Sequence, residues 1–323
     1  MATKRALVLG GGGAKGAFQF GAIKYIEDTI KKQHPGFDYS LIAGVSVGAL
    51  NAVMLAMGKY AAMRNVWEHI SNDQVYTGKL NWLAAVRVLF GAKSVLSNRP
   101  LREKLNELVF LKDVQQAYDL RIGAVSLVDA EYRAFRPSEF DDDEEFRKAV
   151  LASTAIPIVW EPVKDIRLQN ASHVLEVVDG GIRNVSPLGD VIGEDPAEII
   201  IINCHGAKLP IEPAPRVSRN IFKIATRALS DVAINEIFNC DIREFLRIND
   251  LVMQAEACGC TLKKADGAAY KAFKTVLIEP ESDLGDSLDF SPEVSRMRID
   301  KGYRAAEKAF RGYVPARQLV PMA

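Results

Sequence analysis

The sequence predicts an α/β protein whose central sheet is mostly parallel. Residues 6–9 form a short apolar strand, and after a run of glycines a helical pattern continues from Ala17 to about Lys31. Residues 42–45 form a second apolar run that passes directly into a helix-forming stretch. Residues 198–203 include four isoleucines, which is typical of a parallel strand buried on both faces. Strands that alternate with helices in this way build parallel sheets covered by helices.

The composition is that of an ordinary globular protein. Of the 323 residues, 48% are hydrophobic and 25% are charged, which provides enough apolar material for a substantial core in one or two domains. Lysine plus arginine equals aspartate plus glutamate at 41 each, so nucleic acid is not expected as the principal partner. The chain has no apolar run of about 18 residues, so no segment is expected to span a bilayer.

The amino terminus and the cysteines favour a reducing cytoplasm. The first residues carry the positive charge of a signal peptide, but the apolar segment that follows is too short for one, so no cleavage is expected. The four cysteines are sparse, and Cys258 and Cys260 are too close for an ordinary disulfide or a CxxC metal pair. His34 and His69 have no ligand spacing with another histidine or a cysteine, and neither a zinc site nor a cofactor is expected.

A glycine-rich loop, Gly10-Gly-Gly-Gly-Ala-Lys-Gly16, joins the first strand to the first helix. Its backbone amides are unshielded, and amides at a helix amino terminus can hold a phosphate or the oxyanion of an acyl-transfer intermediate. The loop also fits the GxGxxG pattern of dinucleotide-binding folds. However, the acidic residue expected about 20 positions further on is missing, because Glu27 and Asp28 fall inside the first helix. Phosphate binding is therefore the less favoured interpretation.

The segment Gly44-Val45-Ser46-Val47-Gly48 has the GxSxG pattern at the end of the second strand. In a strand-turn-helix unit this spacing puts the serine on a sharp, strained turn, and the flanking glycines let the backbone bend closely enough to expose the hydroxyl. Ser46 is therefore the leading candidate for a nucleophile. The alternative is that Ser46 merely caps the following helix, which a small-residue loop also permits.

A third motif, Val177-Val-Asp-Gly-Gly181, places Asp179 at the end of an apolar strand and in front of a glycine turn. An Asp-Gly pair alone is usually only a turn. The three motifs in this order, together with the small-residue stretch Ala152-Ser-Thr-Ala-Ile-Pro157, resemble the patatin-like phospholipases. The resemblance extends from about Lys4 to at least Cys204.

This resemblance implies a three-layer α/β/α fold and the hydrolysis of acyl esters of lipids. It assigns Ser46 as the nucleophile and Asp179 as its base, and it assigns the oxyanion hole to the backbone amides of Gly11, Gly12 and Gly13. It also implies a lipid or phospholipid substrate, peripheral contact with membrane surfaces, and no cofactor or metal. The head group, the acyl position, the oligomeric state and any activating partner stay open.

The remaining sequence predicts further helices and strands. Helices are expected at residues 49–57, 61–70, 98–108, 146–151, 217–246 and 292–310, and strands at 120–135, 163–178 and 274–279. Because the glycine loop, Ser46 and Asp179 must converge in space, residues 4–205 are expected to form one catalytic core. Residues 206–312 are expected to be a helical extension packed on the same domain, and residues 313–323 a tail.

Two segments allow more than one interpretation. Residues 80–90 form an apolar helical pattern in which only Arg87 is charged. Packing in the core is favoured, and a lid or lipid-facing flap above the serine is the alternative. The acidic run of residues 141–145 suggests a calcium site, but it lacks the alternating oxygen ligands and central glycine of a calcium loop. It stands just before a helix, where acidic side chains complement the helix dipole.

Two other functions fit part of these motifs. A Ser-His-Asp α/β-hydrolase would use Ser46, Asp179 and His205, which stand in that fold's chain order. That fold normally has several strands before its nucleophile, and here only one clear strand precedes the strand that carries Ser46. A nucleotide-binding module without catalysis would use the glycines for phosphate, and it would need neither Ser46 nor Asp179.

Overall fold

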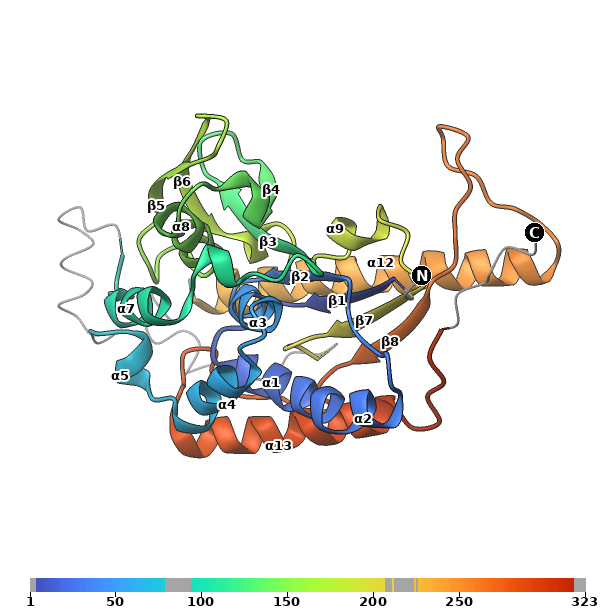
Figure 1. The fold of residues 1–323 in the computed structure, drawn as a ribbon, viewed down its shortest axis with the longest axis horizontal. Coiled ribbons are helices and arrows are strands. Elements are labelled where there is room, and N and C mark those ends of the chain that lie inside the picture. Colours follow the sequence, from blue (N-terminus) through green and yellow to red (C-terminus); the bar gives the residue numbers. More distant parts are fainter. Residues whose placement is uncertain (1–3, 79–93, 207–210, 212–223, 225, 317–323) are drawn as a thin grey trace.

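The computed structural model describes residues 4–78, 94–206, 211, 224 and 226–316, and within them eight strands form one mixed sheet (Figure 1). The strand order is β5-β6-β3-β2-β1-β7-β8, and β4 pairs with β3 off this path. Along this order β3, β2, β1, β7 and β8 are parallel, whereas β4, β5 and β6 pair antiparallel. The strands are β1 Arg5–Leu9, β2 Leu41–Val45, β3 Asp119–Ser126, β4 Tyr132–Phe135, β5 Val163–Arg167, β6 His173–Asp179, β7 Glu198–Ile202 and β8 Lys274–Ile278.

Helices lie on both sides of the sheet (Figure 1). A π-helical turn, Ile26–Ile30, continues α1 into α2, and a second one, Thr226–Ala233, leads into α12. The α-helices are α1 Gly16–Tyr25, α2 Lys31–Gln33, α3 Val47–Ala56, α4 Tyr60–His69, α5 Asn72–Val75, α7 Arg99–Leu108, α8 Asp143–Ser153, α9 Gly189–Ile192, α12 Ile234–Ala257 and α13 Pro292–Ala309.

The two-residue period of the strands explains why both faces of the sheet are covered. Successive side chains of a strand point to opposite faces, and in β1 Leu7 and Leu9 join one apolar cluster while Ala6 and Val8 join another. The first cluster packs against α1, α3, α4 and α13, and the second packs against α9 and α12. All residues of β1, β2 and β7 are buried. The expected three-layer α/β/α fold with a mostly parallel sheet is therefore confirmed.

Residues beyond the three motifs complete this architecture. Strand β8 extends the sheet beside β7, and α13 packs along α1. The two helices approach closely at Gly21 and Gly302, because a Cβ atom at either glycine would overlap a backbone carbonyl of the other helix, that of Ile299 or that of Phe18. Only glycine allows this helix spacing.

The structure has most of the expected elements at their expected positions. Residues 120–135 form β3 and β4, residues 163–178 form β5 and β6, and residues 274–279 contain β8. The helix expected to end at Leu246 continues to Ala257, because Asn249 on α12 remains buried and hydrogen-bonds both backbone groups of Phe273.

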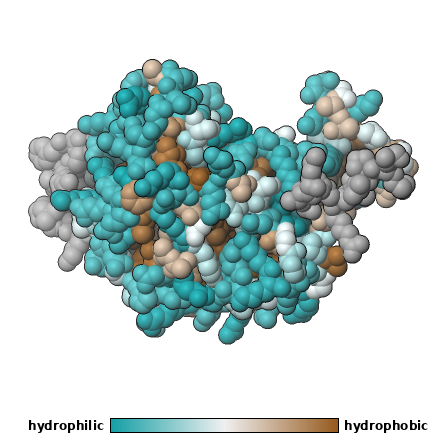
Figure 2. Space-filling view, in the orientation of Figure 1, coloured by the Kyte–Doolittle hydropathy of each residue, from teal (hydrophilic) through white to brown (hydrophobic). Residues whose placement is uncertain are grey.

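Some expectations fall outside the described residues. One is the apolar segment 80–90, so neither its core nor its lid interpretation is tested. The others are the first part of the helix expected at 217–246 and residues 317–323 of the expected tail 313–323. In the part of the chain that is described, no helix is both long and apolar enough to cross a membrane. Figure 2 shows a mostly hydrophilic face on which apolar atoms gather in narrow strips, chiefly in the left half.

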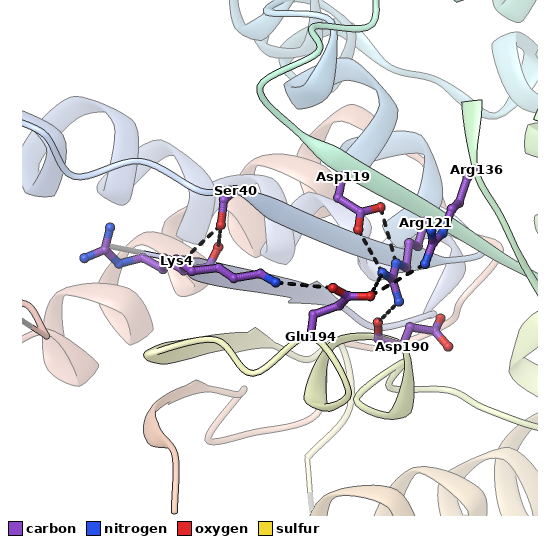
Figure 3. A network of polar contacts seen from close by, with 8 residues as sticks. Lys4, Ser40, Asp119, Arg121, Arg136, Asp190 and Glu194 are labelled. Atoms are coloured by element: carbon purple, nitrogen blue, oxygen red, sulfur yellow. Dashed lines mark hydrogen bonds and ion pairs between the residues drawn. The ribbon is translucent and has the colours of Figure 1, made fainter. Parts of the chain in front are cut away.

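A charged network lies at the amino-terminal ends of the parallel strands (Figure 3). Arg121 of β3, which is buried, donates hydrogen bonds to Asp119 at 2.8 Å and to Glu194 at 2.6 Å. Glu194 also accepts from Lys4 at 3.2 Å and lies 3.7 Å from Arg136. The network thus links β1, β3 and the loop after α9 at the amino-terminal ends of these strands. The candidate site lies at the opposite, carboxyl-terminal ends of β1, β2 and β7, as is usual for parallel sheets.

Candidate active site

Ser46 occupies a strained turn between β2 and α3. Its backbone φ of 57° and ψ of −129° lie outside the regions that a serine ordinarily adopts. A Cβ atom at Gly48 would overlap the Leu9 carbonyl, and one at Gly44 would overlap the Gly48 carbonyl, so this turn requires both glycines of the GxSxG pattern. The Ser46 side chain makes no capping hydrogen bond to α3. The geometry therefore favours the exposed-hydroxyl interpretation over the helix-cap interpretation.

The small-residue segment at the end of α8 holds the backbone of both Ser46 and Asp179. The Ser46 N–H donates to Ser153 Oγ at 2.9 Å, and Ser153 Oγ donates to the Gly123 carbonyl at 2.6 Å. Two residues later, the Ala155 carbonyl accepts from the Asp179 N–H at 3.0 Å. One short segment therefore fixes the spacing between the two candidate catalytic residues. The sequence marked this stretch only through its small side chains and gave no sign of these contacts.

Asp179 lies at the end of β6 beside Ser46 and is almost completely buried. Its Oδ1 accepts from the Gly181 N–H at 2.7 Å, whereas its Oδ2 has no hydrogen-bond partner among the described residues. Desolvation raises the pKa of Asp179 to about 7, although the neighbouring Ser46 hydroxyl and the Gly181 N–H both lower it. The Ser46 hydroxyl is thus near enough to lower the pKa of Asp179, although the two side chains form no regular hydrogen bond in this structure. Hydrogen bonds between a serine nucleophile and its base commonly tighten only when substrate binds.

The backbone amides of the glycine loop are not equivalent. Gly11 N–H donates to the Val185 carbonyl at 3.0 Å, and Ala14 N–H donates to the Ser287 carbonyl at 2.7 Å. Within the described part of the chain, the amides of Gly12 and Gly13 have no acceptor. Unpaired amides beside a serine hydroxyl are suited to stabilising an oxyanion. Of the three amides that the resemblance assigned, two are therefore available in this conformation and that of Gly11 is engaged.

A buried arginine of α13 holds the segment that pairs with this loop. Arg298 is completely buried and donates to the carbonyls of Leu284, Asp286 and Asp289, at 2.8, 2.7 and 2.7 Å. These three carbonyls flank Ser287, whose own carbonyl accepts from the glycine loop. One arginine among the several cationic residues of a closing helix carries no signal in the sequence, so only the structure reveals this support.

His205 lies in the same region but does not join the serine and the aspartate. Its ring is buried against Phe238, with the ring centroids 5.9 Å apart, and no hydrogen bond connects it to Ser46 or Asp179. Burial, and to a smaller extent the nearby Lys15, lower the pKa of His205 to about 3. The imidazole is therefore uncharged at neutral pH.

Two cavities meet at Ser46, and both are lined by Ser46 and Gly13. The first, here called the helical cavity, measures about 170 Å³ and lies among α3, α4 and α7. The second, here called the α12 cavity, measures about 280 Å³ and is also lined by Asp179, Gly12, His205 and the first residues of α12. The nucleophile candidate, the base candidate and the free amides thus share the α12 cavity.

The acidic run of residues 141–145 has a structural role at the start of α8. Asp142 Oδ1 accepts from the Glu145 N–H at 2.8 Å, which caps this helix, and that hydrogen bond lowers the pKa of Asp142. Among the described residues, no cluster of three or more histidine, cysteine or acidic side chains is placed to hold a metal ion.

Comparison with known proteins gives one family and several distant relatives. The family model "Patatin-like phospholipase" matches residues 7–192. The chain is 25% identical over 200 residues to the uncharacterized protein YqhO of Bacillus subtilis, covering 56% of this chain and 64% of that protein. It is 27% identical over 179 residues to a cGAMP-activated phospholipase of Escherichia coli, covering 50% of this chain and 49% of that one.

The match therefore spans less than two thirds of the length of either relative. Among solved structures, VipD from Legionella pneumophila is similar with a TM-score of 0.44 and 12% identity, over 97% of this chain and 67% of that one.

Proposed function

From the premise that this chain belongs to the patatin-like phospholipase family, we propose that it hydrolyses carboxylic esters of lipids with Ser46 as nucleophile and Asp179 as its base. One observation carries the proposal. Ser46, the buried carboxylate of Asp179 and the unpaired amides of Gly12 and Gly13 line a single cavity. A nucleophile, a base and oxyanion donors around one space are the parts that acyl transfer requires.

The proposed reaction has two halves. Asp179 takes the proton of Ser46 while Oγ bonds to the ester carbonyl carbon, and the amides of Gly12 and Gly13 stabilise the resulting oxyanion. The ester C–O bond then breaks, and the leaving alkoxide takes the proton from Asp179. In the second half, water gives its proton to Asp179 and attacks the acyl-serine. The free carboxylic acid leaves, and the proton returns to Ser46.

The burial of Asp179 makes this chemistry more favourable. A carboxylate with its usual pKa is a weak base toward a serine hydroxyl, and a pKa of about 7 brings it close to the working pH. Each oxyanion donor typically contributes about 10²–10³-fold in kcat. Gly11 would add a third donor only after its amide releases the Val185 carbonyl.

Two alternatives are less well supported. A Ser-His-Asp triad would need His205 to bridge Ser46 and Asp179, and the imidazole makes neither contact in this structure. Its lowered pKa also makes it a weak base. A nucleotide-binding module would place a phosphate beside the Asp179 carboxylate, which would repel it.

Labelling with a fluorophosphonate probe tests the nucleophile. The probe should label the wild type, and Ser46→Ala should abolish both labelling and turnover of a soluble short-chain ester. Ser126→Ala is a suitable control, because Ser126 is also a buried serine but lines neither of the two cavities. Labelling that persists in Ser46→Ala would exclude Ser46 as the nucleophile.

Two further variants separate the dyad from the triad. Asp179→Asn should lower turnover by about 10²–10⁴-fold, the usual contribution of a positioned base. His205→Ala should leave turnover within a few-fold of wild type, because no step uses the imidazole. A folded His205→Ala protein as inactive as Ser46→Ala would support the triad instead.

We further propose phospholipids as the substrate class, which would make this enzyme a phospholipase A-type hydrolase. The family assignment supports this choice, as does the name of the Escherichia coli relative. Peripheral membrane contact is supported by apolar side chains on the surface: Leu127 and Val128 after β3 are 52% and 66% exposed, and Leu175 of the paired β6 is 43% exposed. Analysis of the products released from mixed phospholipid vesicles would identify the head group and the acyl position.

A further inference from the structure

The two cavities that meet at Ser46 imply a substrate with two apolar arms. We propose that the site binds a diacyl lipid, with the chain that is cleaved off in the helical cavity and the second chain, on the leaving alcohol, in the α12 cavity. This inference rests on the proposed function, and it adds which lipids the site prefers. It predicts that diacyl lipids are better substrates than their monoacyl counterparts.

The helical cavity suits an acyl chain. Beyond Ser46 its walls are mainly apolar, with Leu50 and Met54 from α3, Met63 from α4 and Leu105 from α7. The cationic side chain of the lining, Lys104, is half-exposed and donates to Glu107 at 2.8 Å, so its charge is already paired. Apolar walls with few polar groups are typical of sites for hydrocarbon chains.

The α12 cavity is also apolar beyond the catalytic groups. Ile156, Ile158 and Ile182 line one side, and Ile234 and Ile237 of α12 line the other. No lysine or arginine stands among its described lining residues. The uncharged His205 and the acidic Asp179 provide no attraction for a phosphate, and the unpaired amides of Gly12 and Gly13 are occupied by the oxyanion in the proposed reaction. A phospholipid head group is therefore disfavoured here, because burying a charged group without a partner is costly. A hydrocarbon chain is favoured, because the two apolar walls remove it from water.

The position of Asp179 decides which arm enters which cavity. Asp179 lines the α12 cavity and is absent from the lining of the helical cavity. In the proposed reaction, Asp179 returns the serine proton to the leaving alkoxide, so the leaving alcohol must lie on the side of Asp179. The second chain, which is carried by that alcohol, then enters the α12 cavity, and the acyl chain on Ser46 enters the helical cavity.

The α12 wall comes from a part of the chain outside the family match. Ala233, Ile234 and Ile237 follow the matched residues 7–192, as does Ser287 on the rim. The matched region therefore supplies the proposed catalytic groups and one wall of the α12 cavity, and residues that follow the match supply the other wall.

The test compares two soluble lipids that differ only in the second chain. Dihexanoyl- and monohexanoyl-glycerophosphocholine are both used below their micelle concentrations, so that neither interfacial packing nor vesicle binding contributes. Each methylene buried in an apolar site contributes about 3- to 4-fold. We therefore expect kcat/KM to be at least about 10-fold higher for the dihexanoyl lipid, allowing for incomplete burial of the second chain.

A substitution that fills the α12 cavity gives the second comparison. Ala233 is exposed on its helix, so Ala233→Phe adds a ring at the cavity without disturbing the core. It should lower kcat/KM for the dihexanoyl lipid at least about 5-fold more than for the monohexanoyl lipid. Leu251→Phe is the matched control, because Leu251 is 46% exposed further along α12 and lines neither cavity. Leu50→Trp, in the helical cavity, should lower kcat/KM for the two lipids by the same factor.

The outcomes separate this inference from the function on which it rests. Equal efficiency on the two lipids, or an equal loss on both in Ala233→Phe, would overturn the two-arm assignment while Ser46 labelling and monoacyl hydrolysis remained. Loss of the labelling of Ser46 itself, or no hydrolysis of either lipid by the wild type, would instead contradict the proposed function.

Discussion

Replacing Asp179 with asparagine is expected to stabilise the folded protein while it lowers turnover by about 10²–10⁴-fold. The native structure keeps this carboxyl almost completely buried, and its Oδ2 has no hydrogen-bond partner among the described residues. Burial of an ionised carboxylate without full compensation is costly. Asparagine is neutral, has nearly the same shape, and can still accept the hydrogen bond from Gly181. The cost of burying the ionised carboxylate should therefore disappear together with the proposed base.

The size and pH dependence of this gain follow from the pKa. A rise from 3.8 to about 7 corresponds to about 4 kcal/mol, because each pKa unit is worth about 1.4 kcal/mol. Below about pH 4 the carboxyl is protonated in both states and costs nothing. Between about pH 4 and pH 7 the native state keeps a proton that the unfolded state has lost, so stability falls as pH rises. Above about pH 7 the wild type carries the whole penalty, so the gain in stability of Asp179→Asn is largest there. The gain is somewhat smaller than the penalty, because an amide oxygen accepts a weaker hydrogen bond from Gly181 than a carboxylate does.

Thermal and urea melts at two pH values measure this difference. At about pH 8, Asp179→Asn should unfold about 5 °C above wild type, and at about pH 4 the two curves should coincide. Asp266→Asn is the control, because exposed Asp266 also accepts from the N–H two residues later, at 2.9 Å, and should not change the melting temperature. A variant less stable than wild type at the higher pH, or a gain independent of pH, would refute the reasoning.

Three further predictions concern the support of the site and of the core. Ser153→Ala removes the acceptor of the Ser46 N–H and should lower kcat on a soluble ester about 10- to 100-fold with little change in KM. Ser126→Ala removes a similarly bonded hydroxyl and should leave kcat unchanged; equal losses would mean a purely structural effect. The wild-type kcat/KM should rise with pH through about 7 as Asp179 ionises, and a profile flat from about pH 5 to 8 would contradict its role as base. Arg5→Met leaves the buried carboxylate of Glu198 without its closest cation and should cost about 3 kcal/mol in urea melts, without a change in kcat.

Local patterns in the sequence predicted the three-layer fold and the elements that carry the candidate residues. The apolar run of β1, the glycine loop and the GxSxG turn each depend on residues adjacent in the chain. The steric requirements of Gly44 and Gly48 are part of that turn, so the pattern alone predicted the strained position of Ser46. The order of the motifs then predicted the family, which the family model confirms.

The same local patterns could not predict how the glycine amides are used. All three looked equivalent in the sequence, but the Gly11 amide is engaged by Val185, which lies far away in the chain. The extension after residue 205 was expected to be helical and packed on the same domain, but the sequence did not indicate that its Ser287 carbonyl contacts the glycine loop or that Arg298 holds the surrounding segment. Such hydrogen bonds depend on which carbonyl points at which amide after folding.

The sequence by itself therefore determined the residue types and the local turns of the candidate site, because strand period, glycine geometry and helix starts are properties of neighbouring residues. Only the tertiary structure decided that Ser153 and Ala155 hold Ser46 and Asp179 side by side and that two apolar cavities meet at the serine. The burial that raises the pKa of Asp179 was decided there as well. Desolvation and cavity shape are set by segments that are distant in the chain and come together only when the layers pack.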